Sequence, residues 1–498
     1  MKVLIRADAS LAIGFGHVAR CLTLAQALRK GGAVVTFACR SLPGNALAQI
    51  AEQGFPAIGL PSHYPQDPVP SDIEASIDWQ ADFAAVQAAF TSQPAFDWLL
   101  VDHYGLDARW QQAARSMAGH IAVIDDLANR QHDADLLLDQ NQTANTAAYA
   151  RLIPAQCQAL LGPHYALLRP EFTGEPIVIA PQIRHVVVSF GGVDAGGETF
   201  KALDALAAFP QLEVDIVAGA ANPAWAQLQQ RAAGQTLWRL HRFVSDFAAL
   251  MREADLFIGA GGGTSWERAA LGLPTICIAV AANQHANAEQ LALMGVHRYL
   301  GLAETVSVQH LQQAIGEMSA DINVRRGYAQ HSRALVDGQG ARRVAAALLT
   351  RCLQLRRATL DDAQLLFDGR NAPLVRRWSL DSAPIAWEQH LSWLTRTLQR
   401  PDRLLLIGEG PGGSVGMLRY DRSATQAERA EVSIYLFAGQ EGMGWGQALL
   451  AMGDRQLTQH WPDVVAIDAT VLPGNAASIK LFRQAGYQQA DTHFVRIL

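Results

Sequence analysis

The sequence predicts an α/β protein in which two domains with doubly wound parallel sheets precede a smaller α+β domain. The chain has 498 residues, of which 50% are apolar and 17% are charged, a composition typical of a globular protein with more than one domain. Short apolar strands alternate with helical segments along residues 1–165 and again along residues 180–345, as in parallel sheets covered on both faces. Strands dominate the middle of residues 353–498, which favours a mixed sheet there.

The first block, residues 1–165, has one long helix near its start. Apolar residues recur at helical spacing from His17 to Lys30, and Gly31 and Gly32 end that helix. Strands are expected at "KVLIRAD", "AVVTFAC", "DWLLVDHYG" and "HIAVIDD". Ligands of such sheets bind beyond the carboxyl ends of the strands. The polar residues at those ends are Arg6, Asp8, Asp102, His103, Tyr104, Asp125 and Asp126.

The second and third blocks follow a segment rich in Pro and Gly, "LLGPHYALLRPEFTGEPIVIAPQ", which is interpreted as a linker. Buried strands of the second block are expected at "IRHVVVSFGG", "LEVDIVAGA", "ADLFIGAGGG" and "PTICIAVAA". The third block begins with a strand and a helix in "LQLRRATLDDAQLLFDGRN". Then come "RLLLIGEG", "SVGMLRYD" and "AEVSIYLF", the glycine-rich "GQEGMGWGQALL" and "VVAIDATVLPGNAASIKLFRQAGY", and strands are expected to dominate the middle of the block.

Charge and cysteine content exclude several classes of function. The formal net charge is -6 and no Lys/Arg block occurs, so no nucleic-acid partner is expected. Five dispersed cysteines indicate reduced thiols in a cytoplasmic protein, and no metal site is expected. The N-terminus lacks the pattern of a signal peptide. The longest uncharged apolar stretch contains Pro274 and is too short to span a bilayer, so a soluble protein without a membrane partner is predicted.

A glycine turn precedes the first helix in "IGFGHVARCLTLAQAL". Gly14 and Gly16 allow a tight turn and a close approach of a ligand to the backbone. The helix N-terminus suits an anion. The same dipole is expected to favour the neutral form of His17, which would then serve as a general base. The alternative is that the turn only packs the helix against its strand and leaves His17 solvated.

Polar, glycine-rich turns of the second block are candidates for binding a nucleotide-sugar. "SFGGVDAGG" is either a phosphate-binding turn or a loop, while "GAGGGTSWERAALGLP" has the composition to wrap a diphosphate. Glu267 either accepts hydrogen bonds from ribose hydroxyls or complements the helix dipole. The polar side chains of "AANQHAN" suit sugar hydroxyls and acetamido groups, or form an ordinary polar loop. The candidate substrate-binding residues of this block are Ser189, Gly191, Gly192, Gly262, Gly263, Thr264, Ser265, Glu267, Asn283, Gln284 and Asn287.

These motifs resemble a known family. The second block resembles the nucleotide-sugar half of GT-B glycosyltransferases, and the first two blocks together resemble the UDP-sugar hydrolases of pseudaminic acid synthesis. The resemblance rests on "RADASLAIGFGHVARCLTLA", "VDHYGLDARW", "IDDLANRQHDADLLLDQN", "LLGPHYALLRPEF", "SFGGVDAGG" and "GGGTSWERAALGLPTICIAVAANQ". It implies two Rossmann-like domains in a GT-B arrangement with an interdomain cleft.

The resemblance also implies an activity. UDP-2,4-diacetamido-2,4,6-trideoxy-β-L-altropyranose would be hydrolysed to UDP and the free sugar, with the family's catalytic histidine at His17. UDP is a good leaving group, and glycine turns at helix N-termini stabilise the growing diphosphate charge. One base on one face of the sugar then gives inversion by a single displacement. Arg6 and Asp8, with His103 and Tyr104, are expected to orient His17 or to bind the sugar.

The third block resembles the GNAT acetyltransferases, which implies acetyl-CoA as co-substrate. "EGMGWGQALL" matches their acetyl-CoA signature, in which a glycine turn at a helix N-terminus binds pyrophosphate. Glu441 stands where Arg or Gln is usual, and Phe482 stands where many relatives have a general-acid Tyr. Glu431 is expected to receive the amine proton, or else to be a solvated surface residue. The candidate cofactor-binding residues are Leu436, Met443, Gly444, Gly446, Gln447 and Asn475.

A further segment, "RRWSLDSAPIAWEQHLSWL", resembles the amino-sugar N-acetyltransferase that acts one step before the hydrolase. It implies transfer of acetyl to the 4-amino group of the UDP-amino-sugar precursor. The sequence therefore predicts a bifunctional enzyme. Two alternatives stay open: a GT-B glycosyltransferase with an unrelated acetyltransferase tail, and a UDP-sugar-binding regulatory module whose tail acetylates a protein.

Overall fold

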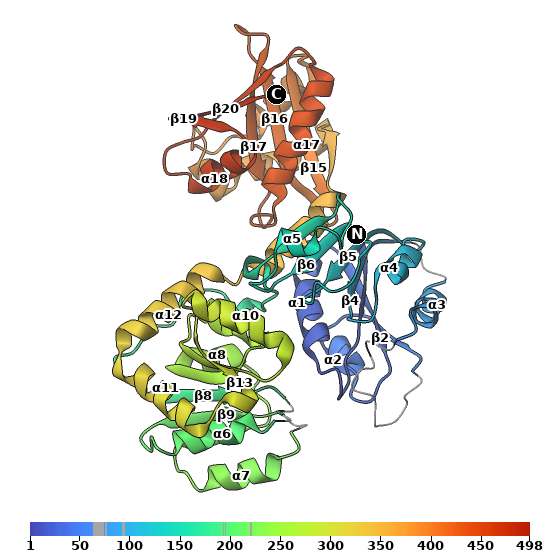
Figure 1. The fold of residues 1–498 in the computed structure, drawn as a ribbon. Coiled ribbons are helices and arrows are strands. Elements are labelled where there is room, and N and C mark those ends of the chain that lie inside the picture. Colours follow the sequence, from blue (N-terminus) through green and yellow to red (C-terminus); the bar gives the residue numbers. More distant parts are fainter. Residues whose placement is uncertain (63–73, 75–76, 92–94, 193, 195, 220–221) are drawn as a thin grey trace. The chain divides into compact units, whose positions relative to one another are not determined.

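Three β-sheets, one in each predicted block, organise the protein in a computed structural model (Figure 1). The structure describes residues 1–62, 74, 77–91, 95–192, 194, 196–219 and 222–498. Contacts divide the chain into two compact units. One unit holds residues 2–26 and 35–344, and therefore the first two sheets. The other holds residues 345–498 with Met1 and residues 27–34.

The first sheet has the strand order β3-β2-β1-β4-β5-β6-β7, and its paired strands run parallel. Its helices α1 and α2 cover one face, and α3 and α4 cover the other (Figure 1). The strands are β1 (Lys2–Ala7), β2 (Val34–Arg40), β3 (Ala57–Leu60), β4 (Phe96–Asp102), β5 (Ala118–Ile124), β6 (Leu136–Asp139) and β7 (Gln158–Leu161). The helices are α1 (Gly16–Lys30), α2 (Leu47–Glu52), α3 (Trp79–Ala89), α4 (Ala108–Ala114) and α5 (Thr146–Tyr149).

The sequence-based strands of this block are confirmed, but three further strands were missed. β3, β6 and β7 have four residues each, too few for alternation or length to distinguish them from loop. β7 begins just before the segment interpreted as a linker and ends inside it. The short 3₁₀ turns η1 (Pro163–Tyr165) and η2 (Pro170–Phe172) follow it.

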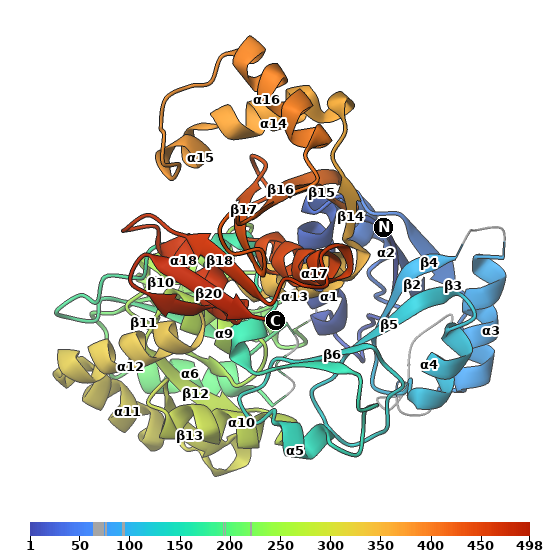
Figure 2. The ribbon, with the colours of Figure 1, turned by 90° about the horizontal axis from the view of Figure 1, so that it is seen from above.

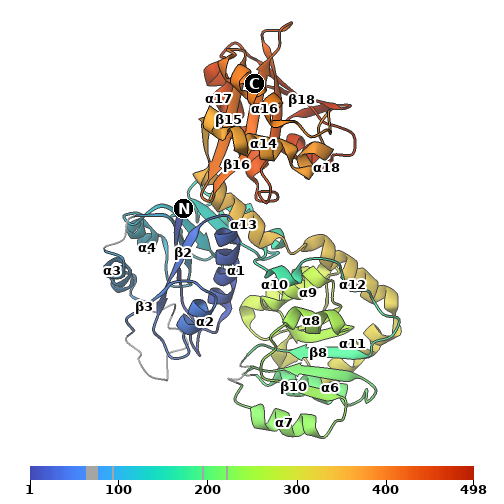
Figure 3. The same cartoon turned by 180° about the vertical axis from the view of Figure 1, so that it is seen from behind.

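The second sheet is also parallel, with the order β10-β9-β8-β11-β12-β13. Helices α6, α7 and α11 pack on one face of it, and α8, α9 and α10 pack on the other (Figure 3). The strands are β8 (His185–Ser189), β9 (Glu213–Val217), β10 (Trp238–His241), β11 (Leu256–Ala260), β12 (Thr275–Ala279) and β13 (Arg298–Leu302). The helices are α6 (Glu198–Leu206), α7 (Trp225–Ala233), α8 (Phe247–Glu253), α9 (Thr264–Leu271), α10 (Ala282–Leu293), α11 (Val308–Ala320) and α12 (Ile322–Leu335), with η3 (Ala303–Thr305) between β13 and α11.

The third sheet is mixed, with the order β14-β15-β16-β17-β18-β20-β19. Figure 2 shows α14 and α16 on one side of β15 and β16 and α17 on the other. β17 and β18 are parallel but pair only from Arg429 to Glu431. The strands are β14 (Gln354–Arg357), β15 (Arg403–Gly410), β16 (Gly413–Arg422), β17 (Arg429–Leu436), β18 (Ala466–Thr470), β19 (Gln488–Ala490) and β20 (His493–Ile497). The helical segments are α13 (Gly340–Leu349), η4 (Thr350–Cys352), η5 (Leu360–Asp362), α14 (Ala363–Asn371), α15 (Pro373–Arg377), α16 (Trp387–Gln399), α17 (Trp445–His460) and α18 (Ala476–Gln484).

The predicted fold class is confirmed: two parallel α/β sheets precede an α+β domain. All five cysteines lie within the described residues and are thiols rather than disulfides. Over the same residues, no helix has the length and apolar character to cross a bilayer. No group of three or more His, Cys, Asp or Glu side chains in the described ranges is placed to hold a metal ion.

Candidate active site

The glycine turn before α1 is built by its own backbone. The N–H of Gly14 donates to the carbonyl of Ser10 at 2.8 Å, and the Ser10 hydroxyl accepts the N–H groups of Ala12 and Ile13 at 3.2 and 3.0 Å. Gly14 has a φ of +81°, where L residues are strained. A Cβ added at Gly14 or at Gly16 would meet no atom within 4 Å. The turn is therefore open on its outer side at the start of α1.

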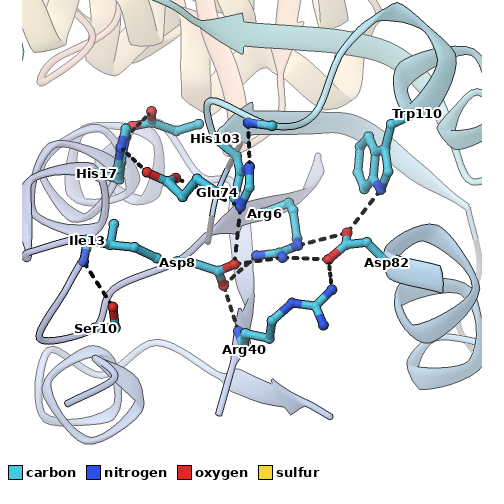
Figure 4. Close-up of polar contacts among 12 residues, drawn as sticks. Arg6, Asp8, Ser10, Ile13, His17, Arg40, Glu74, Asp82, His103 and Trp110 are labelled. Carbon is cyan, nitrogen blue, oxygen red and sulfur yellow. Dashed lines mark hydrogen bonds and ion pairs between the residues drawn. The ribbon is translucent and has the colours of Figure 1, made fainter. Parts of the chain in front are cut away.

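His17 lies in the first turn of α1 and is 6% exposed. Its Nδ1 lies 2.6 Å from Oδ1 of Asp102, at the end of β4. A carboxylate only accepts, so Nδ1 carries the proton of this bond. Nε2 lies 3.6 Å from Oε2 of Glu74 (Figure 4). The ring of Tyr104 packs edge-on against the imidazole, with 4.7 Å between the centroids.

The prediction that His17 is neutral is wrong. Burial opposes its charge, but the carboxylates of Asp102 and Glu74 outweigh burial and raise the pKa of His17 to about 10. A helix N-terminus acts as about half a positive charge, whereas two full negative charges lie beside this ring. The imidazolium is therefore the resting form at neutral pH, and His17 becomes an acceptor of protons only as the pH rises.

A pocket of about 600 Å³ lies at His17 and is lined by residues from both sheets of the first unit. The structure brings together there many residues predicted from the sequence. They are Gly16, His17, Tyr104, Gly262, Gly263, Thr264, Glu267, Asn283, Gln284 and Asn287. The predicted residues outside its lining are Arg6, Asp8, Gly14, His103, Ser189, Gly191, Gly192 and Ser265.

Arg6 and Asp8 are buried at the end of β1, so protein atoms surround both side chains. Arg6 donates to Asp8 at 2.6 and 2.8 Å and also to Asp82 of α3, which Trp110 and Arg40 bind as well (Figure 4). Arg6 therefore makes structural contacts with Asp8 and Asp82, and its predicted role in substrate binding stays a prediction.

His103 connects this buried group to the site. Its Nδ1 accepts a hydrogen bond from the N–H of Gly105 at 3.0 Å, so Nε2 is a proton-bearing nitrogen of this ring. Nε2 lies 3.4 Å from Oδ2 of Asp8 and 3.8 Å from Oε1 of Glu74. Glu74 therefore lies between His103 and His17, and both imidazoles favour its charged form. Burial raises the pKa of Glu74, but the bond to His17 and the charge of His103 lower it overall.

The turn before α9 presents a helix N-terminus to the pocket. Gly263 is the N-cap and no side chain caps the helix there, so backbone N–H groups at its start are open to an anion. Glu267 follows in the first turn, and its Oε1 lies 3.7 Å from a nitrogen of Arg169. Burial raises the pKa of Glu267, and Arg169 opposes that shift. A carboxylate that lines the pocket is suited to accept hydrogen bonds from hydroxyl groups of a ligand.

Several predicted residues beside these turns have structural contacts instead. The Ser265 hydroxyl accepts from Arg268 at 2.9 Å, and the Ser189 hydroxyl donates to the carbonyl of Val217 at 3.0 Å. Gly192 lies against Gly219, where an added Cβ would approach its carbonyl to 2.5 Å. The binding roles of these serines and of Gly191 and Gly192 stay predictions.

The amide side chains of the pocket are partly engaged. Asn287 Oδ1 accepts the N–H of Gln142 at 2.8 Å, and Gln284 Oε1 accepts the N–H of Val280 at 3.1 Å. These bonds fix both carboxamides and use their oxygens, so their NH₂ groups are the donors that remain for a ligand.

Some residues that line the pocket were not predicted as site residues. Arg20, Gln140 and Asn141 lie on its first-sheet side, and Arg169 lies in the linker. Arg20 follows His17 by three residues, so helical spacing places both on one face. Asp126 follows a strand end and was noted only for that position. The further lining residues are Ile13, Ala19, Thr23, Leu167, Leu168, Gly261, Trp266 and Ala281.

A second glycine turn lies in the third block, before α17. Gly444 is the N-cap of α17 with a φ of +72°, and no side chain caps this helix. Gly442 has a φ of +76°. Gly446 lies in the first helical turn, where an added Cβ would approach Leu481 of α18 to 3.1 Å. The sequence thus builds an open, uncapped helix N-terminus, and Gly446 lets α18 pack closely against it.

Comparisons with known proteins assign this block. Residues 353–488 match the family profile "Acetyltransferase (GNAT) domain". The third block is a GNAT domain. Residues 201–345 match the profile "Glycosyltransferase family 28 C-terminal domain", which covers most of the second sheet with α9 and its glycine turn. The predicted resemblance to the acetyltransferases is therefore confirmed.

Relatives cover the rest of the chain. The UDP-2,4-diacetamido-2,4,6-trideoxy-beta-L-altropyranose hydrolase of Campylobacter jejuni is 28% identical over 59% of this chain and 97% of its own, so that resemblance is confirmed too. The uncharacterized protein MJ1062 of Methanocaldococcus jannaschii is 22% identical over 98% of this chain and 97% of its own. The crystal structure of MurG from Acinetobacter baumannii is 15% identical, with a TM-score of 0.49, over 70% of this chain and 98% of its own.

Within the GNAT domain, the predicted residues differ in their surroundings. Glu431 is exposed on β17 and accepts the hydroxyl of Thr470 at 3.0 Å. Asn475 caps α18, where its Oδ1 accepts the N–H of Ser478 at 3.1 Å. Phe482 is buried against Tyr487 and Phe494. Leu436 ends β17 and Met443 precedes Gly444, while Gln447 is exposed on α17. Their cofactor and catalytic roles stay predictions.

Proposed function

We propose that the chain is a bifunctional enzyme of nucleotide-sugar metabolism. Its GNAT domain transfers acetyl from acetyl-CoA to the 4-amino group of a UDP-amino-sugar. Its first unit hydrolyses UDP-2,4-diacetamido-2,4,6-trideoxy-β-L-altropyranose to UDP and the free sugar. The observation that carries the hydrolase assignment is the pocket that His17, held from behind by Asp102, lines together with the uncapped N-terminus of α9. The similarity to the hydrolase of Campylobacter jejuni supports the choice of substrate.

The second sheet supplies the UDP-binding side of this proposal. The diphosphate binds at the backbone N–H groups of Gly262, Gly263 and Thr264, where the dipole of α9 favours negative charge. The Glu267 carboxylate accepts hydrogen bonds from the ribose hydroxyls. The amides of Asn283, Gln284 and Asn287 contact the sugar and its acetamido groups.

The first sheet supplies the proton acceptor. Neutral His17, held through Nδ1 by Asp102, takes a proton from water at Nε2. The water oxygen forms a bond to the anomeric carbon while the bond from that carbon to the diphosphate oxygen breaks. UDP leaves with the electron pair, and the anomeric configuration inverts. The glycine turns stabilise the charge that develops on the diphosphate.

The GNAT domain performs the acetyl transfer. The turn at Gly442–Gly444 and the first N–H groups of α17 bind the pyrophosphate of acetyl-CoA. The sugar ammonium loses a proton, through water, to Glu431. The neutral amine then attacks the thioester carbon, so that a carbon–nitrogen bond forms and the carbon–sulfur bond breaks. The amine nitrogen loses its second proton to the departing thiolate, which leaves as the thiol of CoA.

The order of the two reactions favours their fusion in one chain. The acetylated sugar is the compound that the hydrolase consumes. A covalent link raises the local concentration of the second site for the product of the first.

Purified protein and defined UDP-sugars test the proposal. With the diacetamido UDP-sugar and no acceptor, we expect UDP and free sugar in equal amounts, and inversion at the anomeric carbon by NMR. With acetyl-CoA and the 4-amino UDP-sugar, mass spectrometry should detect gain of one acetyl group. UDP release only after addition of a sugar or lipid acceptor would indicate a glycosyltransferase instead. Acetylation of a protein but not of the sugar would support the regulatory alternative.

A further inference from the structure

Arg20 occupies the helical turn after His17, and its side chain is 12% exposed in the pocket wall. Its Nε donates to Oδ2 of Asp102 at 2.6 Å, and one terminal nitrogen donates to Oδ1 of the same carboxylate at 2.6 Å. The other terminal nitrogen donates to Oδ2 of Asp126 at 3.0 Å. One guanidinium therefore binds two carboxylates from the ends of β4 and β5.

The double bond from Arg20 restrains Asp102. This carboxylate has no exposed surface and receives Nδ1 of His17 on the oxygen that also accepts from Arg20. The thiol of Cys21 contacts its other oxygen at 3.5 Å. The two parallel hydrogen bonds from Arg20 to the two oxygens of Asp102 form a fork, which rotation of the carboxylate would break. A planar guanidinium therefore holds this planar carboxylate in one orientation. The direction of the His17 bond is thereby fixed as well.

A second series of contacts leads from Arg20 through Asp126 and Tyr104 back to His17. The Tyr104 hydroxyl donates to Oδ2 of Asp126 at 3.1 Å, the oxygen that Arg20 also binds. The ring of Tyr104 packs on the imidazole of His17. The contacts thus close a ring of five side chains that starts and ends at His17, and a terminal nitrogen of Arg20 also lies 3.2 Å from Nδ1 of His17.

We infer that Arg20 is a positioning residue for His17, which it orients through Asp102 on one side and through Asp126 and Tyr104 on the other. The role rests on the proposed hydrolase function. Positioning of His17 requires the two parallel hydrogen bonds of the arginine side chain, which a lysine cannot form.

Arg20 also affects when His17 accepts a proton. Asp102, Glu74, Arg20 and the ring of Tyr104 face the imidazole directly, His103 and Asp8 lie beyond Glu74, and Asp126 lies beyond Arg20. Burial and the charge of Arg20 lower the pKa of His17, while Asp102 and Glu74 raise it to about 10. Without the arginine charge, the negative charge of Asp102 is no longer partly neutralised and acts more strongly on His17. The pKa of the imidazole should therefore rise further.

An NMR titration of His17 in the ligand-free protein tests this without any substrate. The His17 imidazole signal is the one absent from His17→Ala. In Arg20→Met, its midpoint should rise by one unit or more above that of the unmodified protein. Arg109→Met is the matched control, because Arg109 is 66% exposed and pairs only with Asp107 and the Trp79 ring among its described contacts. An unchanged midpoint in Arg20→Met would overturn the inference.

Arg20→Lys separates the effect of positioning from the effect of charge. It also tests the positioning role if the Met variant does not fold. It keeps the charge and loses the fork, so kcat for hydrolysis should fall at least tenfold while KM stays within about twofold. Wild-type kcat would contradict a positioning role. Weaker UDP binding by calorimetry with unchanged kcat would instead make Arg20 a diphosphate contact. Absence of hydrolysis in the unmodified protein would refute the proposed function and leave the titration result intact.

Discussion

Nδ1 of His17 and Oδ1 of Asp102 lie 2.6 Å apart, although 85 positions separate the two residues in the chain. The parallel pairing of β1 with β4 brings them together, because α1 follows β1 and Asp102 ends β4. The bond fixes which imidazole nitrogen is available to a water molecule. It also makes the protonation of His17, on α1, depend on a carboxylate at the end of β4.

Replacement of His17 by alanine should abolish hydrolysis but not nucleotide binding. Loss of a general base typically costs about 10²- to 10⁴-fold in rate. The α9 turn, to which the proposed function assigns the diphosphate, belongs to the other sheet, so the Kd for UDP should change little. Rates of UDP release and calorimetry would check this. Acetyl transfer by the same variant serves as the folding control, and near-normal UDP release would refute the role of His17.

The pH dependence of hydrolysis should have a long alkaline limb. The pKa of His17 is raised to about 10, so the neutral base is scarce at pH 7 and grows about tenfold per pH unit below that pKa. The value of kcat/KM should therefore rise with a slope near one up to about pH 10. A profile that is flat between pH 6 and 9 would mean that the imidazolium, and not the neutral base, supports the reaction.

Asp102→Asn should move that limb toward lower pH. The substitution removes the negative charge that raises the pKa of His17, and it leaves Asp126 as the remaining carboxylate partner of Arg20 among its described contacts. The maximal rate should fall because the amide no longer fixes the imidazole tautomer. Removal of one partner from a buried ion pair costs about 3–5 kcal/mol, which urea unfolding would measure. If the rise of kcat/KM stayed at its original pH, the charge of Asp102 would not be the cause of the raised pKa of His17.

Glu267→Gln should weaken UDP binding more than it slows the chemical step. Hydrogen bonds to a charged acceptor contribute about 1.5–3 kcal/mol, so the Kd should rise roughly 10- to 100-fold. Calorimetry with UDP would measure the change. Glu171→Gln is the matched control, since Glu171 also contacts Arg169, at 3.3 Å, but does not line the pocket. Equal effects of the two variants would leave Glu267 as a structural partner of Arg169.

Gly444→Asp should abolish acetyl-CoA binding and leave hydrolysis unchanged. The φ of +72° at this position disfavours a side chain, and a carboxylate there would repel pyrophosphate. Gly486→Asp makes the same change at another positive-φ glycine, where a Cβ meets no atom within 4 Å. Thermal shift with acetyl-CoA would separate the two variants, because ligand binding raises Tm by mass action. A ligand-induced shift in Gly444→Asp equal to that of Gly486→Asp would refute the turn as the cofactor site.

Local patterns predicted much of the fold and part of the site. The strands with five or more buried residues, the glycine turns and the position of His17 follow from alternation, spacing and glycine content. Asp82 gave no such signal, because a charged residue within a helix is normally solvated, and the signal for Arg20 was its helical spacing from His17 alone. Asp82 is buried only because Arg6, Arg40 and Trp110 converge on it.

The protonation of His17 was predicted incorrectly for a related reason. The sequence shows the helix dipole next to the histidine, but it does not show the carboxylates of Glu74 and Asp102, which the fold brings from elsewhere. For the same reason, the sequence did not show that the hydroxyls of Ser189 and Ser265 bind Val217 and Arg268, and their predicted roles as ligand contacts stay predictions.

The pocket divides its tasks between two sheets. The ring of side chains around His17 comes from α1 and from the ends of β4 and β5, whereas the open helix N-terminus and Glu267 belong to α9 of the second sheet. Under the proposed function, nucleotide preference and reaction type reside on separate sheets and can evolve separately. Exchange of residues 180–345 for those of a relative that prefers another nucleotide should produce a chimera that cleaves a new donor by unchanged proton chemistry.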